Sequence, residues 1–179
     1  LPITETCNGY DDDRNGIIDD PSYCWQTVNR FVSPSSSYCF GFGTSPPPTC
    51  PGYTYQRSAF ITATQAIPNA TGIVECSKGN DHIIVSVNAP EFSARRTAGY
   101  DCSYQLGYLP IPGTAPSNTP YGNGCTLYRF GYTNLLGQAS HVATIGDDGT
   151  SGITCEPPDR FQAYAPPGGT CFTLRPSGC

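Results

Sequence analysis

The sequence is poor in charge. Only 13% of its 179 residues are charged, lysine occurs once, at Lys78, and methionine is absent. Average domains are about one quarter charged, so long helices with ion-paired surfaces are not expected. No apolar stretch approaches the roughly 20 residues that a membrane-spanning helix needs. With 9 basic against 14 acidic residues, the chain also lacks a basic surface for nucleic acid. We therefore expect neither a membrane span nor a nucleic-acid partner.

Residues suited to enzyme chemistry are scarce as well. His82 and His141 are the only side chains that can act as a general base near neutral pH without a large pKa shift. The motifs of serine hydrolases, zinc proteases and phosphate-binding loops are absent. The acids available for glycoside hydrolysis show no spacing that pairs them: Glu75, Asp81, Glu91, Asp101, Glu156 and Asp159. The sequence predicts a protein without catalytic activity.

Cysteine, glycine and proline are abundant instead, with 10, 20 and 18 copies. Ten cysteines in a chain of this size are typical of the disulfide framework of a secreted protein. The chain begins with Leu1 rather than methionine, which is typical of a protein whose signal peptide has been removed. We expect secretion, with every cysteine paired.

An acidic segment stands at the start of the chain. Residues 1–20 hold six acids and one arginine, whereas the charges of residues 21–179 cancel. Residues 11–20 match calcium loops, which place oxygen side chains at positions 1, 3 and 5, a glycine at 6 and a backbone carbonyl at 7. Oxygen ligands without histidine or thiolate favour calcium over zinc. We expect one calcium ion, bound by Asp11, Asp13, Asn15, the carbonyl of Ile17, and Asp19 or Asp20. The alternative is an Asp/Asn/Gly turn without metal.

This segment also resembles a metal-binding repeat of bacterial surface and secreted proteins. That repeat reads E-x-C-N-G-x-D-D-D-C-D-G-x-x-D-E, and residues 5–20 read E-T-C-N-G-Y-D-D-D-R-N-G-I-I-D-D. Arg14 stands where the repeat has its second cysteine, so Cys7 must pair elsewhere. Cys24 is the nearest candidate.

Internal repetition follows the acidic segment. Three apolar-polar strings begin at Val28, Val74 and Leu127, and each is followed 24 or 25 residues later by a glycine-led string. Between them lies a matching third string, which begins at Tyr38, His82 and His141. An aromatic-rich string closes each unit. Because His82 and His141 hold equivalent positions, a role in packing or hydrogen bonding is favoured for both.

Each unit therefore predicts four short strands joined by Pro-, Gly-, Ser- and Asn-rich turns. We expect an all-β, β-trefoil-like fold in which three four-stranded repeats share one disulfide-rich core. Residues 1–23 form the calcium-loop segment and residues 24–179 the β domain, with units of about 24–71, 72–123 and 124–179. The second expectation is an irregular disulfide-held β-sandwich. One short helix is expected over residues 89–96, capped by Asn88.

Residues 24–175 also resemble a family of three-repeat secreted domains. Its strings are Y-R-x-Y, D-H-F-Y-T-T and G-Y-x-x-E-G-x-x-G-Y. This chain has Y-R-F from Tyr128, D-H-I-I-V from Asp81, and G-Y from Gly99 with a later L-G-Y. The resemblance implies a trefoil of extracellular proteins without an assigned activity. The glutamate of the E-G string is missing here, so a binding role for that position is not carried over.

Among the possible disulfide pairings, we favour those between cysteines close in sequence. A disulfide that closes a loop of moderate size stabilises a fold by about 3 kcal/mol. Cys7–Cys24 would close the acidic loop, and the remaining pairs would be Cys39–Cys50, Cys76–Cys102, Cys155–Cys171 and Cys125–Cys179. Asn69 begins the sequon Asn-Ala-Thr at a proline-containing turn, so it is a candidate N-glycosylation site.

These features favour a secreted, non-catalytic, calcium-stabilised binding module. Twelve tyrosines, eight phenylalanines and Trp25 could stack on sugars, which makes carbohydrate or cell-surface adhesion the first hypothesis. The alternative is a structural subunit of an extracellular filament or coat, because low charge and many disulfides suit a durable assembly. The partners would then be glycans or copies of the chain itself.

Overall fold

The computed structural model describes residues 3–146, 154–156 and 161–179. These form ten β-strands, one α-helix and one short 3-10 helix, Ser22–Cys24. The helix α1 spans Pro90–Thr97. The strands are β1 Trp25–Val32, β2 Tyr38–Gly41, β3 Thr54–Ala63, β4 Ala70–Lys78, β5 Asp81–Ser86, β6 Asp101–Pro110, β7 Cys125–Thr133, β8 Ala139–Thr144, β9 Thr154–Cys155 and β10 Phe161–Ala163. None of the described helices is long and apolar enough to cross a membrane.

All strand pairs are antiparallel, and the first strand of each sequence unit lies in the centre of its group. β1 lies between β2 and β3, and β4 lies between β5 and β6. β7 has β8 on one side and β9 and β10 on the other. A pairing between Ala63 and Tyr108 joins the first two groups into one six-stranded sheet, and β7, β8 and β10 form the second sheet with β9 beside β7.

The expectation of four strands in each unit is wrong for the first two units. The glycine-led string of unit one runs into β3, which also holds the aromatic-rich string, and β6 does the same for unit two. Register shifts between Val28 and Asn29 and between Arg30 and Phe31 let β3 continue along β1 without a turn. The described residues therefore form ten strands in two sheets, bridged by an antiparallel pairing between Ile61 and Tyr164, and not the twelve strands that we expected. The all-β class is confirmed.

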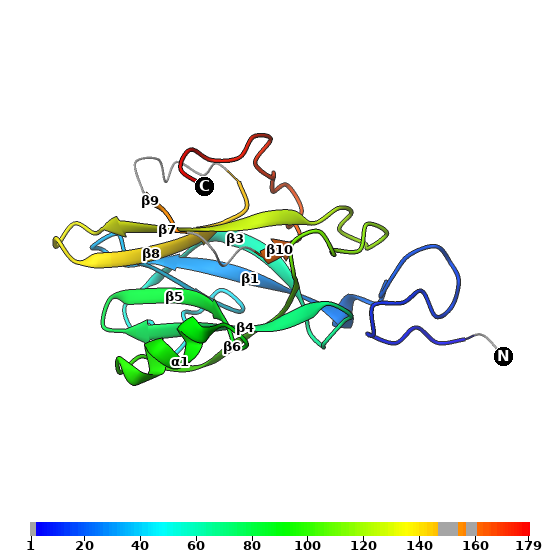
Figure 1. Cartoon of the computed structure of the whole chain (residues 1–179), viewed down its shortest axis with the longest axis horizontal. Helices are drawn as coiled ribbons and strands as arrows, with labels where there is room; N and C mark the ends of the chain where they lie inside the picture. Colours follow the sequence, from blue (N-terminus) through cyan, green and yellow to red (C-terminus); the bar gives the residue numbers. More distant parts are fainter. Residues whose placement is uncertain (1–2, 147–153, 157–160) are drawn as a thin grey trace.

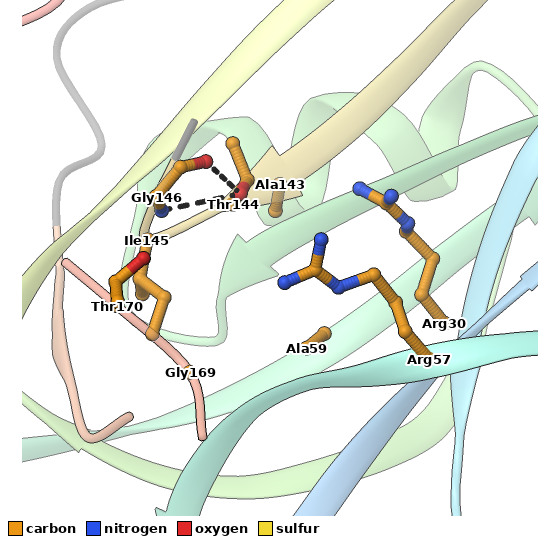
Figure 2. Close-up of a pocket in the computed structure, with 9 residues that line it drawn as sticks. All are labelled: Arg30, Arg57, Ala59, Ala143, Thr144, Ile145, Gly146, Gly169 and Thr170. Carbon is orange, nitrogen blue, oxygen red and sulfur yellow. Dashed lines mark hydrogen bonds between the residues drawn. The ribbon is translucent and has the colours of Figure 1, made fainter. Parts of the chain in front are cut away.

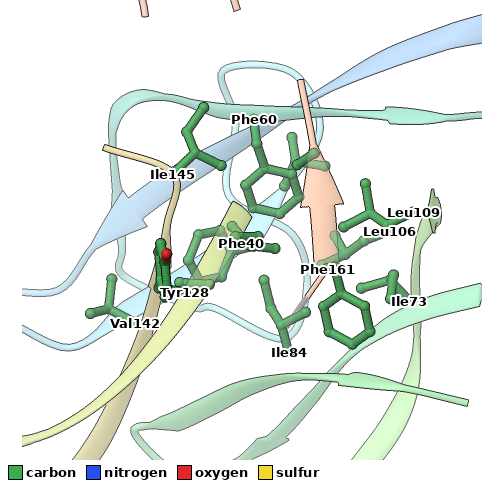
Figure 3. Packing of buried hydrophobic residues seen from close by; sticks show 14 of the residues in the cluster. Phe40, Phe60, Ile73, Ile84, Leu106, Leu109, Tyr128, Val142, Ile145 and Phe161 are labelled. Atoms are coloured by element: carbon green, nitrogen blue, oxygen red, sulfur yellow. The ribbon is translucent and has the colours of Figure 1, made fainter. Parts of the chain in front are cut away.

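The largest hydrophobic cluster draws on all three units, and Figure 3 shows side chains from several strands pointing into it. This largest cluster fits the expected shared core, but three smaller hydrophobic clusters of the described residues are separate from it. The members of the largest cluster include Phe40, Phe60, Ile73, Ile84, Leu106, Leu109, Leu127, Val142 and Phe161. Each fully buried side chain of this kind stabilises the fold by about 1.5–3 kcal/mol.

Helix α1 begins one residue later than expected, and its N-cap is Ala89. Asn88 does not cap it, because its side-chain amide donates to the Thr71 hydroxyl at 3.1 Å. Pro90 holds the first helical position, where its missing N–H costs nothing.

All ten cysteines form disulfides. Cys7–Cys24, Cys39–Cys50 and Cys76–Cys102 pair as predicted. The last two pairs are corrected to Cys125–Cys171 and Cys155–Cys179. The reason is strand order: Cys125 lies beside Ala163 at the end of β10, so the chain that leaves β10 meets it first, whereas Cys155 lies farther along β7, opposite Phe130.

The acidic N-terminal segment extends from one end of the strand-rich body (Figure 1). The Cys7–Cys24 disulfide holds it there, and Gly9 lies against Ile67 and Pro68 so closely that a Cβ would stand 2.5 Å from the proline ring. The indole N–H of Trp25 donates to the Asp19 carbonyl at 2.6 Å. Trp25 is itself buried between the rings of Tyr121 and Tyr164. The segment is thus docked at defined points.

Candidate cation site and buried ion pairs

The acidic loop is folded by hydrogen bonds from its own backbone amides to its side chains. Asp11 accepts from the amides of Asn15 (3.0 Å) and Gly16 (2.8 Å), and Asp13 accepts from that of Asn15 (3.0 Å). The Asn15 carboxamide oxygen accepts from the Ile17 amide at 2.8 Å. Gly16 has a φ of 93°, which supplies the sharp turn that the spacing predicted.

Three carboxylates converge in this loop. Oxygens of Glu5, Asp11 and Asp13 lie within 4.8 Å of one another, and Glu5 is buried. Glu5 is held by the amides of Asp12 (3.3 Å) and Asp13 (3.2 Å). Like charges at this separation repel. The arrangement gives a divalent cation a set of hard oxygen ligands.

The loop spacing alone did not place Glu5 among the ligands. The one signal that could have done so is the metal-binding repeat, in which glutamate is the first residue. Of the ligands that the spacing did predict, Asp11 and Asp13 lie in the convergent group, and Asn15 lies beside it, with its side-chain amide donating to Asp13 at 3.2 Å and to Asp20 at 2.9 Å.

Asp19 faces away from this group. Its carboxylate accepts from the backbone amides of Asn8 (3.0 Å) and Gly9 (2.9 Å). Burial raises its pKa, although these two amide bonds act in the opposite direction. Asp19 therefore ties residues 8–9 to the base of the loop rather than pointing at the convergent carboxylates.

The aromatic residues divide into core and surface. Trp25 and most phenylalanines are buried, so they offer no stacking face. Tyr10 and Tyr23, by contrast, are 61% and 62% exposed, and both flank the acidic loop. The Tyr23 hydroxyl donates to the backbone carbonyl of Glu5 at 3.3 Å. Asn69 is exposed with a φ of 57°, in the turn between β3 and β4.

His82 is fully buried with Glu75. Its Nδ1 lies 3.1 Å from Glu75 Oε1, and neither side chain is exposed to solvent. Burial raises the pKa of Glu75, against the opposing effect of the hydrogen bond with His82. The ring of Tyr53 packs edge-on against His82, and the Cys39–Cys50 disulfide lies beside the pair.

His141 belongs to a closed ring of seven polar side chains. Its Nδ1 lies 2.5 Å from Asp81 and its Nε2 lies 3.2 Å from Glu156. The remaining links are hydrogen bonds of 2.5–3.2 Å, in the order Asp81, Tyr100, Arg95, Glu91, Arg129 and Glu156. Two arginines and a protonated histidine balance three carboxylates in this ring. It joins α1 and β5 of unit two to β7 and β8 of unit three.

The ring brings together acids that the sequence left scattered. Asp81, Glu91 and Glu156 meet there, and Glu75 meets His82, whereas Asp101 remains exposed. Asp159 lies outside the described residues. Both histidines make hydrogen bonds inside the protein, each with a carboxylate, which agrees with the role in packing or hydrogen bonding that the sequence favoured.

Two hollows lie in the part of the body that the structure describes. One between β3 and the end of β8 has a volume of only about 10 Å³, with Arg30 and Arg57 on one side and Thr144 and Gly146 on the other (Figure 2). This is room for about one water. A larger hollow of about 320 Å³ lies between β7 and residues 171–175.

Comparisons with protein-family models, with curated proteins and with solved structures found no match for this chain.

Proposed function

We propose that this protein is a secreted, non-catalytic binding module that holds one calcium ion in residues 5–20 and recognises carbohydrate on a cell surface. The observation that carries the calcium proposal is the convergence of the Glu5, Asp11 and Asp13 carboxylates. A divalent cation would offset their repulsion. Asn15, the Ile17 carbonyl and Asp20 are near enough in sequence to complete the six to eight oxygens that calcium takes.

Two tyrosines support the carbohydrate proposal. Tyr10 and Tyr23 are the exposed aromatic residues of the acidic segment, and flat aromatic faces stack on the apolar faces of sugar rings. A calcium ion beside them would add a site for sugar hydroxyls. Because Tyr23 bonds to the backbone of Glu5, ordering of the loop by calcium would also order this aromatic face.

Secretion and lack of catalysis are supported by two further observations. Five disulfides with no free thiol suit an oxidising compartment. Both histidines are engaged by carboxylates inside the protein, which leaves neither poised toward a substrate.

Thermal melting with and without chelator, together with calorimetric titration, tests the calcium proposal. Asp13→Asn should abolish the rise of Tm with calcium, because it removes one convergent charge, whereas Asp101→Asn in the exposed start of β6 should keep it. Absence of any response to millimolar calcium in the unmodified protein would show that the loop is an acidic turn only.

Retention on glycan beads tests the carbohydrate proposal. We expect retention in calcium, release by chelator or by free sugar, and loss of retention in the Tyr10→Ala, Tyr23→Ala double variant. Tyr55→Ala is the matched control, since Tyr55 is 43% exposed but lies on β3. Retention that survives chelator and the double variant would contradict this assignment.

A structural subunit is the second candidate, and the turn between β7 and β8 favours it. Leu135 and Leu136 are 76% and 64% exposed there. The side-chain oxygen of Asn134 accepts from the amides of Leu136 and Gln138, both at 2.9 Å, which fixes the turn. Fibres or sheets seen by electron microscopy, and lost in Leu135→Ser, Leu136→Ser, would favour this candidate.

A further inference from the structure

A second group of metal-binding side chains lies buried in the body, away from the acidic loop. It comprises Cys39 on β2, Cys50 in the loop after β2, Glu75 on β4 and His82 on β5, and none of the four is more than 1% exposed. A sulfur atom from each cysteine and a nitrogen of His82 lie within 4.8 Å of one another. In the structure the two sulfurs are joined in a disulfide.

The distances in this group are close to those between ligands of a tetrahedral zinc ion. Cys50 Sγ lies 3.9 Å from His82 Nδ1 and 3.9 Å from Glu75 Oε1, and these last two atoms are 3.1 Å apart. Zinc bonds of about 2.0–2.3 Å in a tetrahedron put neighbouring ligand atoms about 3.3–3.8 Å apart. Three of four ligand atoms thus form a triangle of nearly the required size.

The surroundings of the group fit a metal site as well. The Phe40 amide donates to Glu75 Oε2 at 2.5 Å, which turns Oε1 toward the sulfur and the histidine. Such outer contacts orient metal ligands. His82 Nε2 is buried without a hydrogen-bond partner among the described residues, so the outer contact that usually orients a ligating histidine is missing there. The polar contacts that this ring does make are through Nδ1, the atom that faces Cys50 and Glu75.

We propose that Cys39 and Cys50, in their dithiol form, bind one zinc ion together with His82 and Glu75, so that this position accepts either a disulfide or a structural zinc. Reduction of the disulfide by two equivalents of a thiol such as glutathione gives two thiols and one oxidised glutathione. Binding of Zn²⁺ to the two thiols then releases two protons. Either state would close the same loop between residues 39 and 50.

Because both cysteines are buried, the disulfide or the zinc site must form during folding. Neither sulfur is exposed in the folded protein, so reductants and metal ions reach this pair before the core closes around it. The supply of zinc and the redox state during folding should therefore decide which state is trapped.

Refolding of the fully reduced chain tests the proposal. The chain is refolded in a glutathione buffer with excess calcium, with or without Zn²⁺, and is then freed of loose metal by gel filtration. We expect one zinc per chain, and after acid quenching Cys39 and Cys50 should be the two cysteines that alkylation labels. With Co²⁺ instead, we expect the intense visible absorption of a tetrahedral ion and a thiolate-to-cobalt charge-transfer band.

Variants separate this site from other thiols. Cys39→Ser, Cys50→Ser should retain no metal, whereas Cys76→Ser, Cys102→Ser, which removes the disulfide of unit two, should still retain one ion. His82→Gln should weaken binding by at least about tenfold. Labelling at other cysteines, or no retained metal in the unmodified chain, would overturn the proposal without reliance on any variant. Because calcium is present throughout, the outcome is independent of the acidic loop.

Discussion

Each ring nitrogen of His141 faces a carboxylate, and these two carboxylates stabilise the protonated form of the histidine. Burial by itself would lower its pKa, but the hydrogen bonds to Asp81 and Glu156 outweigh this and raise the pKa to about 9, from an ordinary value of 6.5. The same contacts with His141 lower the pKa of Glu156, and they help to lower that of Asp81 against the effect of its burial. His141, Asp81 and Glu156 are therefore charged near neutral pH.

This charge makes stability depend on pH in a defined direction. Because the pKa of His141 is higher in the folded than in the unfolded protein, the protonated histidine stabilises the folded state. This contribution is complete below about pH 6.5 and is lost as the pH rises through about 9. The loss should be about 3 kcal/mol at most. Urea unfolding at several pH values measures it, and His141→Gln should remove most of the dependence in this window. An unmodified protein that is equally stable at about pH 6.5 and pH 9 would contradict the charged ring.

At the scale of elements, Glu91 links helix α1 to unit three. Glu91 accepts from Arg95 on its own helix at 2.9 Å and from Arg129 on β7 at 3.0 Å. The Arg129 side chain is only 7% exposed, so a lost partner is not replaced fully by water.

Glu91→Gln should therefore lower the free energy of unfolding by about 1–3 kcal/mol. Arg96→Gln, in the exposed last turn of the same helix, should change it by no more than about 0.5 kcal/mol. Chemical denaturation of both variants provides the comparison. Equal effects of the two substitutions would show that α1 is held by its local contacts alone.

Elements were predictable where their signals are local. The strands around Val28, Val74 and Leu127 follow apolar-polar patterns, and each contains the first string of its unit. The continuity of β3 was not predictable, because it depends on register shifts against β1 that leave no mark in the sequence. The predicted pairing of the two C-terminal disulfides was wrong, because their partners are set by the order of strands in the second sheet.

The candidate sites divide in the same way. Asp11 and Asp13 are close in sequence, so spacing alone predicted their meeting. Glu91 and Arg129, 38 positions apart, meet only through the packing of α1 against β7. Contacts of this range depend on tertiary structure, which single-sequence patterns do not specify.

At the scale of the whole molecule, the disulfides Cys125–Cys171 and Cys155–Cys179 fasten the C-terminal chain to β7 and β9. Mass mapping of a non-reduced digest should recover these two linked pairs. Chymotryptic cleavage after Phe172 or Leu174 separates Cys171 from Cys179, so each partner can be assigned. Recovery of Cys155 linked to Cys171 would restore the pairing that the sequence favoured.

Trp25 connects the acidic segment to the body and can report on both, because it is the only tryptophan in the chain. Its indole donates to the Asp19 carbonyl, and the preceding residue, Cys24, is bonded to Cys7. If calcium orders the loop, its removal should let Asp19 move away and water reach the indole.

We therefore expect chelator to shift the Trp25 emission to longer wavelength at temperatures well below unfolding, while the body stays folded by circular dichroism. The Cys7→Ser, Cys24→Ser variant should show a larger shift and weaker calcium binding, because the unlinked segment has more entropy to lose when the ion binds. Asp13→Asn should give the shifted spectrum with or without calcium. If the emission spectrum does not change with calcium in any of the three proteins, the contact between the segment and Trp25 does not depend on the ion. The acidic loop and the body would then be stabilised separately.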